Sequence, residues 1–149
     1  MNYQEGRKLI IKKEFNKALI FFKKFYEKEN DKIEVLFYLG RIYYELNEFQ
    51  NSIFFFKKCN ILRKNSPNIM FNLARVQQSL GQIDEAKNIY FKLIEIDPNN
   101  IKPYFELSNI NINNIKDSHF IKLKILSKDD NVNLLDRSLI NFIFSKLKK

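Results

Sequence analysis

Three of the five arginines in the chain recur at intervals of 34 residues, although most of the other cationic side chains are lysines. An aromatic residue precedes each of them by four positions: the pairs are Tyr3 and Arg7, Phe37 and Arg41, and Phe71 and Arg75, and Phe105 and Asn109 hold the next equivalent positions. Residues four apart share one face of a helix, so each guanidinium group would lie beside an aromatic ring. Guanidinium groups bind carboxylates and phosphates through paired hydrogen bonds and stack on aromatic rings. The spacing therefore predicts a surface that binds an extended or helical peptide carrying Asp, Glu or phosphate groups.

The same recurrence has a second, purely structural interpretation. An arginine at a regular interval can be a solvated residue or the partner of a neighbouring Glu, and aromatic residues at helical spacing can belong partly to the core. Replacing all three arginines with alanine separates the two interpretations. Loss of stability with unchanged partner binding would contradict the peptide-binding interpretation.

Residue types that support catalysis or metal binding are sparse. The chain has one cysteine, Cys59, and one histidine, His119, whereas a zinc site needs several converging nitrogen or sulfur ligands. The sequence contains no glycine-rich phosphate loop, no nucleophile elbow and no paired carboxylates in a pocket-forming context. We therefore predict no enzymatic activity, no cofactor and no metal. Cys59 is expected to be a buried packing residue, and His119 a surface or capping residue.

The net charge of +9 raises the question of a nucleic-acid partner, because clustered cations bind phosphates by releasing counterions. The charge is spread along the chain: residues 1–32 carry +4, 33–66 carry +2, 67–100 carry −1 and 101–149 carry +4. A mild lysine excess of this kind is typical of a solvated surface. Nucleic acid is therefore disfavoured as the main partner, and RNA binding on a basic face is kept as a weaker hypothesis.

The sequence also lacks the patterns of membrane and export segments. Its start, MNYQEGRKLIIKKEFNKA, has no apolar run like that of a signal peptide. Nowhere do about 18 uncharged apolar residues follow one another, as a membrane span requires. We expect a cytoplasmic protein without membrane insertion.

The elements that would position the arginines are helices. Long segments with apolar residues at helical spacing alternate with short turn signals, and no stretch shows the two-residue alternation of a half-buried strand. When residues 67–100 are numbered 1 to 34 as repeat positions, all glycines and alanines of the chain fall on positions 8, 15 or 20. They are Gly6, Gly40 and Ala74 at position 8, Gly81 at position 15, and Ala18 and Ala86 at position 20.

Small residues at these positions have a physical reason. Where two antiparallel helices cross with axes about 8–10 Å apart, a large side chain at the crossing point would push them apart. Positions 8 and 20 therefore predict where paired helices touch. Gly81 would end the first helix of its pair in a left-handed cap. Asp97-Pro98 would end the second helix, because proline cannot continue it.

The segment MFNLARVQQSLGQIDEAKNIYFKLIEIDPNN, residues 70–100, resembles a tetratricopeptide repeat, with small residues, an aromatic residue and a terminal Asp-Pro at the family's separations. Residues 33–66 resemble a second copy, and residues 1–32 a first copy that lacks its two opening positions. The second copy departs from the pattern at Asn47 for glycine, Ser52 for alanine and Lys64 for proline. Each departure is mild, because Asn tolerates left-handed backbone, Ser is small and the proline only ends a helix.

The resemblance implies an all-α fold, a right-handed α-solenoid of stacked helix hairpins in one domain over residues 1–149. We expect about four repeats, over about 1–32, 33–66, 67–100 and 101–128, and a terminal helix over about 132–148, which makes about nine helices. The pattern loosens after residue 100, where Phe120 occupies position 20. On the terminal helix, helical spacing predicts one inward face made of Leu135, Leu139, Phe142 and Ile143.

In this family the first helices of the repeats line a concave groove, and the resemblance implies that repeat positions 2, 5, 6, 9, 12 and 13 point into it. The candidate partner-binding residues therefore lie on the first helices. They are Arg7, Arg41, Arg75, Tyr3, Phe37, Phe71, Phe105, Tyr38, Tyr44, Asn72, Lys102 and Asn109.

Some family members bind carboxyl-terminal peptides through a clamp for two carboxylates. The residues of such a clamp are matched here at Asn72 and Lys102, whereas Phe37, Arg41 and Glu106 do not match. Chaperone-tail binding by that mode is therefore disfavoured.

These observations predict a protein interaction module, a scaffold that binds a protein or peptide in the groove without chemistry, with arginines suited to an acidic partner. The alternative is the non-catalytic repeat region of a protein that joins tetratricopeptide repeats to a sulfotransferase. Full repeats, a shortened pair and then DRSLINFIFSKL follow one another in a similar order there. The sequence leaves open the partner, the pathway, the oligomeric state and whether the chain is part of a longer protein. Reading the genomic sequence past Lys149 tests the alternative.

Overall fold

The computed structural model describes residues 2–148, and within them the chain forms nine α-helices, one 3-10 helix and no strand. In chain order they are α1 (Gln4–Ile11), α2 (Phe15–Lys28), α3 (Ile33–Glu45), α4 (Phe49–Leu62), α5 (Pro67–Ser79), α6 (Ile83–Ile96), α7 (Ile101–Ile110), η1 (Ile112–Asn114), α8 (Asp117–Ser127) and α9 (Leu134–Leu147). The predicted all-α class with about nine helices is confirmed. None of the helices in residues 2–148 combines the length and hydropathy needed to cross a bilayer.

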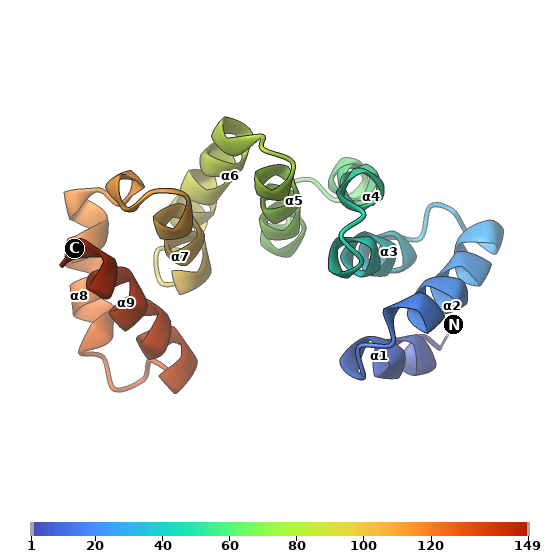
Figure 1. Ribbon diagram of the computed structural model, residues 1–149, viewed down its shortest axis with the longest axis horizontal. Helices are drawn as coiled ribbons and strands as arrows, with labels where there is room; N and C mark the ends of the chain where they lie inside the picture. The colour runs from blue at the N-terminus through green and yellow to red at the C-terminus, as the bar shows by residue number, and fades with distance from the viewer. Residues whose placement is uncertain (1, 149) are drawn as a thin grey trace. The chain divides into compact units, whose positions relative to one another are not determined.

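The helices form two compact units. Unit 1 extends to Gln82 and contains α1 to α5, and unit 2 begins at Ile83 and contains α6 to α9 (Figure 1). The single domain over 1–149 and its division into repeats stay predictions, and residues 1 and 149 lie outside the described residues.

In unit 1 each helix packs against the next, and α3 also contacts α5. The shared core is apolar. It contains Ala18, Phe22, Val35, Leu36, Leu39, Ile42, Tyr43, Phe55, Cys59 and Ile69. Of the three consecutive phenylalanines on α4, Phe55 and Phe56 are buried, whereas Phe54 is half exposed, because a helix turns only part of its circumference to the core.

The small residues lie where helices touch, as the sequence predicts. A methyl group at Gly6 would lie 2.6 Å from ring atoms of Phe21 and Phe22 on α2, and one at Gly40 would lie 3.0 Å from the Phe56 ring on α4. The Ser52 hydroxyl on α4 donates a hydrogen bond of 2.7 Å to the Gly40 carbonyl oxygen, so backbone and side chain meet at this crossing. The alanines at positions 8 and 20, Ala18, Ala74 and Ala86, are fully buried.

Unit 2 is also built of helices, but they do not pair in the regular hairpin order of unit 1. α7 packs against α6 and α9, and α8 packs against α9. α7 ends at Ile110, where Asn111 is extended (φ −163°) and η1 follows. Repeat position 15 holds Ile115, whose φ stays at −84° because a β-branched residue resists the left-handed region. The tight turn of the earlier hairpins is therefore not formed here.

The predicted inward face of the terminal helix is wrong at two residues. Leu135 is 65% exposed and Phe142 is 46% exposed, whereas Ile140 and Ile143 are fully buried. α9 contacts both α7 and α8, so the line that faces the unit runs through Ile140 and Ile143. Phe142 still packs its ring 5.4 Å from that of Phe105 on α7.

Candidate functional site

Two of the three recurring arginines stack on tyrosines of α3. The Arg7 guanidinium, from α1, lies 5.6 Å from the centre of the Tyr38 ring, and the Arg75 guanidinium, from α5, lies 4.5 Å from that of Tyr44. Arg75 also donates a hydrogen bond of 3.3 Å to the Tyr44 hydroxyl. A cation over an aromatic ring is attracted by the negative face of the ring. Each of these two guanidinium groups is thus held against a tyrosine ring of α3.

Arg41 differs from the other two arginines. It lies on α3 itself, it is exposed, and its guanidinium makes no hydrogen bond or ion pair within residues 2–148. A solvated, unpaired guanidinium can bind a carboxylate without first breaking an internal contact.

The aromatic residues near Arg7 form a packed group. Tyr38 stacks on Phe22 with ring centres 4.7 Å apart, and Tyr3 lies 6.4 Å from Tyr38 and 5.3 Å from Phe25. Burial raises the pKa of the Tyr3 hydroxyl, and the nearby carboxylates of Glu29 and Glu34 raise it further. Tyr3 and Tyr38 therefore contribute to packing as well as to the candidate surface.

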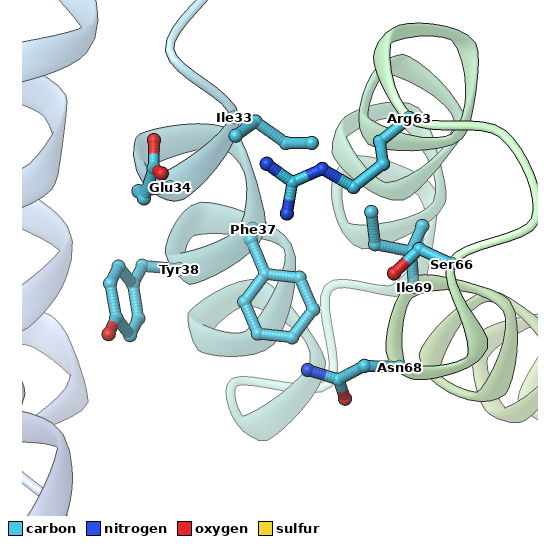
Figure 2. A pocket seen from close by; sticks show the side chains of 8 residues that line it. All are labelled: Ile33, Glu34, Phe37, Tyr38, Arg63, Ser66, Asn68 and Ile69. Carbon is cyan, nitrogen blue, oxygen red and sulfur yellow. The ribbon is translucent and has the colours of Figure 1, made fainter.

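A pocket of about 160 Å³ opens between α3, the end of α4 and the start of α5, all in unit 1 (Figure 2). Its lining combines apolar and polar side chains. They are Ile33, Glu34, Phe37 and Tyr38 on α3, Arg63 and Ser66 in the segment that follows α4, and Asn68 and Ile69 on α5. Figure 2 shows the Arg63 side chain reaching from the end of α4 toward α3, whereas the Glu34 carboxylate points away from Phe37.

The polar groups of this pocket are accessible. Arg63 is exposed and has no ion pair or side-chain hydrogen bond within residues 2–148. Ser66 immediately precedes α5, and its hydroxyl makes no capping hydrogen bond. The side-chain oxygen of Asn68 accepts a hydrogen bond of 3.2 Å from Asn72. Sequence reasoning missed Arg63, Ser66 and Asn68 as a group. The scarcity of arginine in the chain was a signal that could have drawn attention to Arg63.

The other predicted site residues lie apart from this group or are half-buried. Phe71 and Asn72 are half-buried on α5, and Asn72 donates a hydrogen bond of 2.8 Å to the Asn68 carbonyl oxygen. On α7, in unit 2, Lys102 is exposed and Phe105 packs on Phe142.

Asn109, at the repeat position of the arginines, joins two helices of unit 2. Its side-chain oxygen accepts a hydrogen bond of 2.6 Å from the Lys146 ammonium group on α9, which also donates to the Ser108 carbonyl oxygen at 3.1 Å. Partial burial lowers the pKa of Lys146. Asn109 therefore already has an internal partner.

Cys59 and His119 have structural roles. Cys59 is fully buried, its thiol lies 3.8 Å from the Ile33 carbonyl oxygen, and burial raises its pKa to about 12, which suppresses the thiolate that nucleophilic attack requires. The His119 Nδ1 accepts the Lys116 backbone N–H at the start of α8, so its predicted capping role is confirmed. Among residues 2–148 no group of three His, Cys, Asp or Glu side chains could hold a metal ion.

The sequence matches the model of a known family. The model described as anaphase-promoting complex, cyclosome, subunit 3 matches residues 11–93, more than half of the chain. The chain belongs to this family of tetratricopeptide-repeat proteins. Among curated proteins no significant match is found.

Solved structures of tetratricopeptide-repeat proteins are also similar to this chain. The first repeat domain of Spaghetti (RPAP3), bound to the Hsp90 peptide SRMEEVD, is 19% identical, with a TM-score of 0.66 over 72% of this chain and 85% of that chain. MamA is 18% identical, with a TM-score of 0.66 over 98% and 92%. YrrB, described as having an unusual peptide-binding site, is 16% identical, with a TM-score of 0.65 over 96% and 74%. At these identities the similarity shows the fold, an all-α solenoid of helical hairpins.

Proposed function

We propose that this tetratricopeptide-repeat protein is an interaction module, a scaffold that binds a polypeptide segment along the first helices of its repeats. The observation that carries the proposal is the set of arginines around α3. Arg7 and Arg75 are stacked on Tyr38 and Tyr44, and Arg41 is exposed and has no ion pair among the residues that the structure describes. Stacked guanidinium groups need little reordering when they bind a carboxylate, which lowers the entropic cost of association.

Two of the similar structures support a peptide as the partner. The Spaghetti (RPAP3) domain is bound to SRMEEVD, which carries three acidic residues, and YrrB has a peptide-binding site. In this chain the arginines around α3 would play the corresponding part for an acidic peptide. The carboxylate clamp is not expected, because Phe37 and Arg41 stand where it needs other residues.

We further propose that binding occurs without chemistry and in the cytoplasm. The buried, protonated thiol of Cys59 and the capping hydrogen bond of His119 leave neither side chain placed for nucleophilic or acid-base work. The alternative, a repeat region that serves a sulfotransferase, stays a prediction from the order of the repeats. The genomic sequence beyond Lys149 would decide it.

Binding can be tested with peptides selected from a random phage-displayed library, made as fluorescein conjugates and titrated by fluorescence polarisation. The sharpest variant is Arg41→Ala. Arg41 has no hydrogen-bond or ion-pair partner in the described part of the chain, so its loss should leave the melting temperature unchanged. We expect its affinity for acidic peptides to fall about five- to tenfold. Lys57→Ala, which removes an exposed cation on α4, is the matched control and should bind normally. If neither Arg41→Ala nor the triple Arg7, Arg41 and Arg75 variant weakens binding, the proposal fails.

A further inference from the structure

We propose that the pocket between α3, the end of α4 and the start of α5 is an anchor site for one bulky apolar side chain of the bound peptide, and that an acidic residue beside this anchor pairs with Arg63. The inference rests on the proposed peptide-binding function and adds the class of partner, an acidic segment with an aliphatic or aromatic anchor.

The size of the pocket fits one side chain. Its volume of about 160 Å³ is well below the roughly 300–1,000 Å³ that is typical of sites for small molecules and cofactors. A protruding peptide side chain needs less room, because its backbone stays outside. The pocket therefore suits an anchor residue of a longer ligand.

The apolar wall of the pocket is already in place. Ile69 is buried, and Ile33 and Phe37 are half-buried, so part of their apolar surface still faces solvent. The Phe37 ring packs edge-on against Phe56 with ring centres 5.7 Å apart, and it lies 6.3 Å from the Tyr38 ring. A ring held in this way loses little freedom when an anchor covers it. Buried apolar anchors in preformed pockets supply most of the affinity of such interfaces.

The charged side chains around the pocket favour an acidic peptide residue next to the anchor. Arg63 brings an exposed guanidinium that has no ion pair or side-chain hydrogen bond within residues 2–148, and Ser66 and Asn68 add hydrogen-bonding groups on the same side of the pocket. The only carboxylate in the lining, Glu34, points away from Phe37 (Figure 2). An acidic peptide residue is therefore attracted on the side of Arg63 and repelled on the side of Glu34, which also fixes the direction in which the peptide lies.

The test uses the full chain and the peptides selected on it. We expect an enrichment of Leu, Ile, Met or Phe next to Asp or Glu. Arg63→Ala should weaken a fluorescein-labelled selected peptide about tenfold, whereas Lys64→Ala, an exposed cation one residue away, should stay within about twofold. Replacing the acidic peptide residue with its amide should remove the difference between wild type and Arg63→Ala, since the pair is then already broken.

A second variant tests the pocket itself. Asn68→Trp places a large ring at its mouth without removing a buried residue, so we expect a more than tenfold loss of binding with the helical circular dichroism signal retained. Peptides that bind the wild type but are indifferent to both Arg63→Ala and Asn68→Trp would overturn this inference and leave the proposed function intact. If no peptide binds the wild type at all, both fail together.

Discussion

Repeat position 15 places three different residues in the same left-handed backbone conformation. Lys13, Asn47 and Gly81 have φ values of 59°, 59° and 77°. Glycine adopts this region at no steric cost and Asn tolerates it, whereas a Lys side chain is strained there. The turn is therefore imposed by the hairpin, and the residue that fills it determines how much stability the turn costs.

We predict that Lys13→Gly stabilises the protein by about 0.5–1 kcal/mol. The relief of left-handed strain, about 1–2 kcal/mol, exceeds the extra entropy that glycine loses on folding. Urea unfolding of both proteins measures the difference. Lys12→Gly is the control and should destabilise, because Lys12 has an ordinary helical φ of −75°. Equal or lower stability of Lys13→Gly would contradict the strain argument.

The environment of His119 implies that the stability of the fold depends on pH. Burial, and to a lesser degree the charge of Lys116, lowers the pKa of its imidazole, and its Nδ1 must be unprotonated to accept the Lys116 N–H. A lowered folded-state pKa means that this stability is fully present above the unfolded pKa of about 6.5. It is lost as the pH falls from there through the folded pKa.

We therefore expect unfolding free energies from urea titrations to fall between about pH 7 and pH 5.5. His119→Gln should lack this decline, since His119 is the only histidine in the chain. Most carboxylates titrate at lower pH, near about 4, so they contribute little in this window. The same slope in wild type and variant would exclude His119 as its source.

At the scale of helices, the spacing of small residues predicted where paired helices cross and where the first helix of one pair ends. Gly40 does meet Phe56, and Gly81 does lie in the left-handed region, with φ 77°, just after the end of α5. These features are local, because each follows from a size or backbone limit at one position. The face of α9 was not predictable in the same way. Helical spacing offered more than one apolar line, and the contacts with α7 and α8 select the one through Ile140 and Ile143.

The candidate site, too, could be predicted only in part from spacing along the sequence. Recurrence identified Arg7, Arg41 and Arg75. The tyrosine partners of Arg7 and Arg75 lie on α3, a different helix, which spacing within one helix cannot show. The pocket at Arg63 joins a segment between two helices to residues of α3 and α5. Apart from Glu34 and Asn68, which both hold position 2, its members occupy different repeat positions, so the recurrence does not predict that they meet.

Gly6→Ala tests the helix crossing. A methyl group at this position would lie 2.6 Å from the Phe21 and Phe22 rings, and Phe22 is fully buried. Overpacking costs about 1–3 kcal/mol, and the better helix propensity of alanine offsets about 1 kcal/mol. We expect a net loss of up to about 2 kcal/mol in chemical unfolding, with faster hydrogen exchange in Gln4–Ile11 as α1 moves away from α2.

Ser108→Ala is the matched control for that substitution. Ser108 holds the same repeat position in α7, is 2% exposed and already carries a Cβ atom. Its hydroxyl bonds only within its own helix, to the Phe105 carbonyl oxygen at 2.7 Å. The variant should change stability by no more than about 1 kcal/mol. A larger loss there than at Gly6 would contradict the crossing argument.

At the scale of the whole molecule, the net charge and the candidate site favour different classes of partner. The net charge of +9 favours any polyanion, whereas the arginines that define the site are few and two are stacked on tyrosines. Long-range attraction depends on total charge, but tight phosphate binding needs several cations along one path. The lysine excess is divided between the two ends of the sequence, with a net charge of −1 over residues 67–100.

We therefore predict weak retention on heparin, with elution below about 0.3 M NaCl and a logarithmic salt slope corresponding to no more than about three ion contacts. Arg41→Ala should leave this elution nearly unchanged while it weakens the selected acidic peptides, because one guanidinium is a small part of the total charge but a large part of the binding surface. Elution at high salt, with a steep salt slope that Arg41→Ala reduces, would show that the arginines bind a polyanion. The peptide-binding proposal would then give way to the RNA-binding hypothesis.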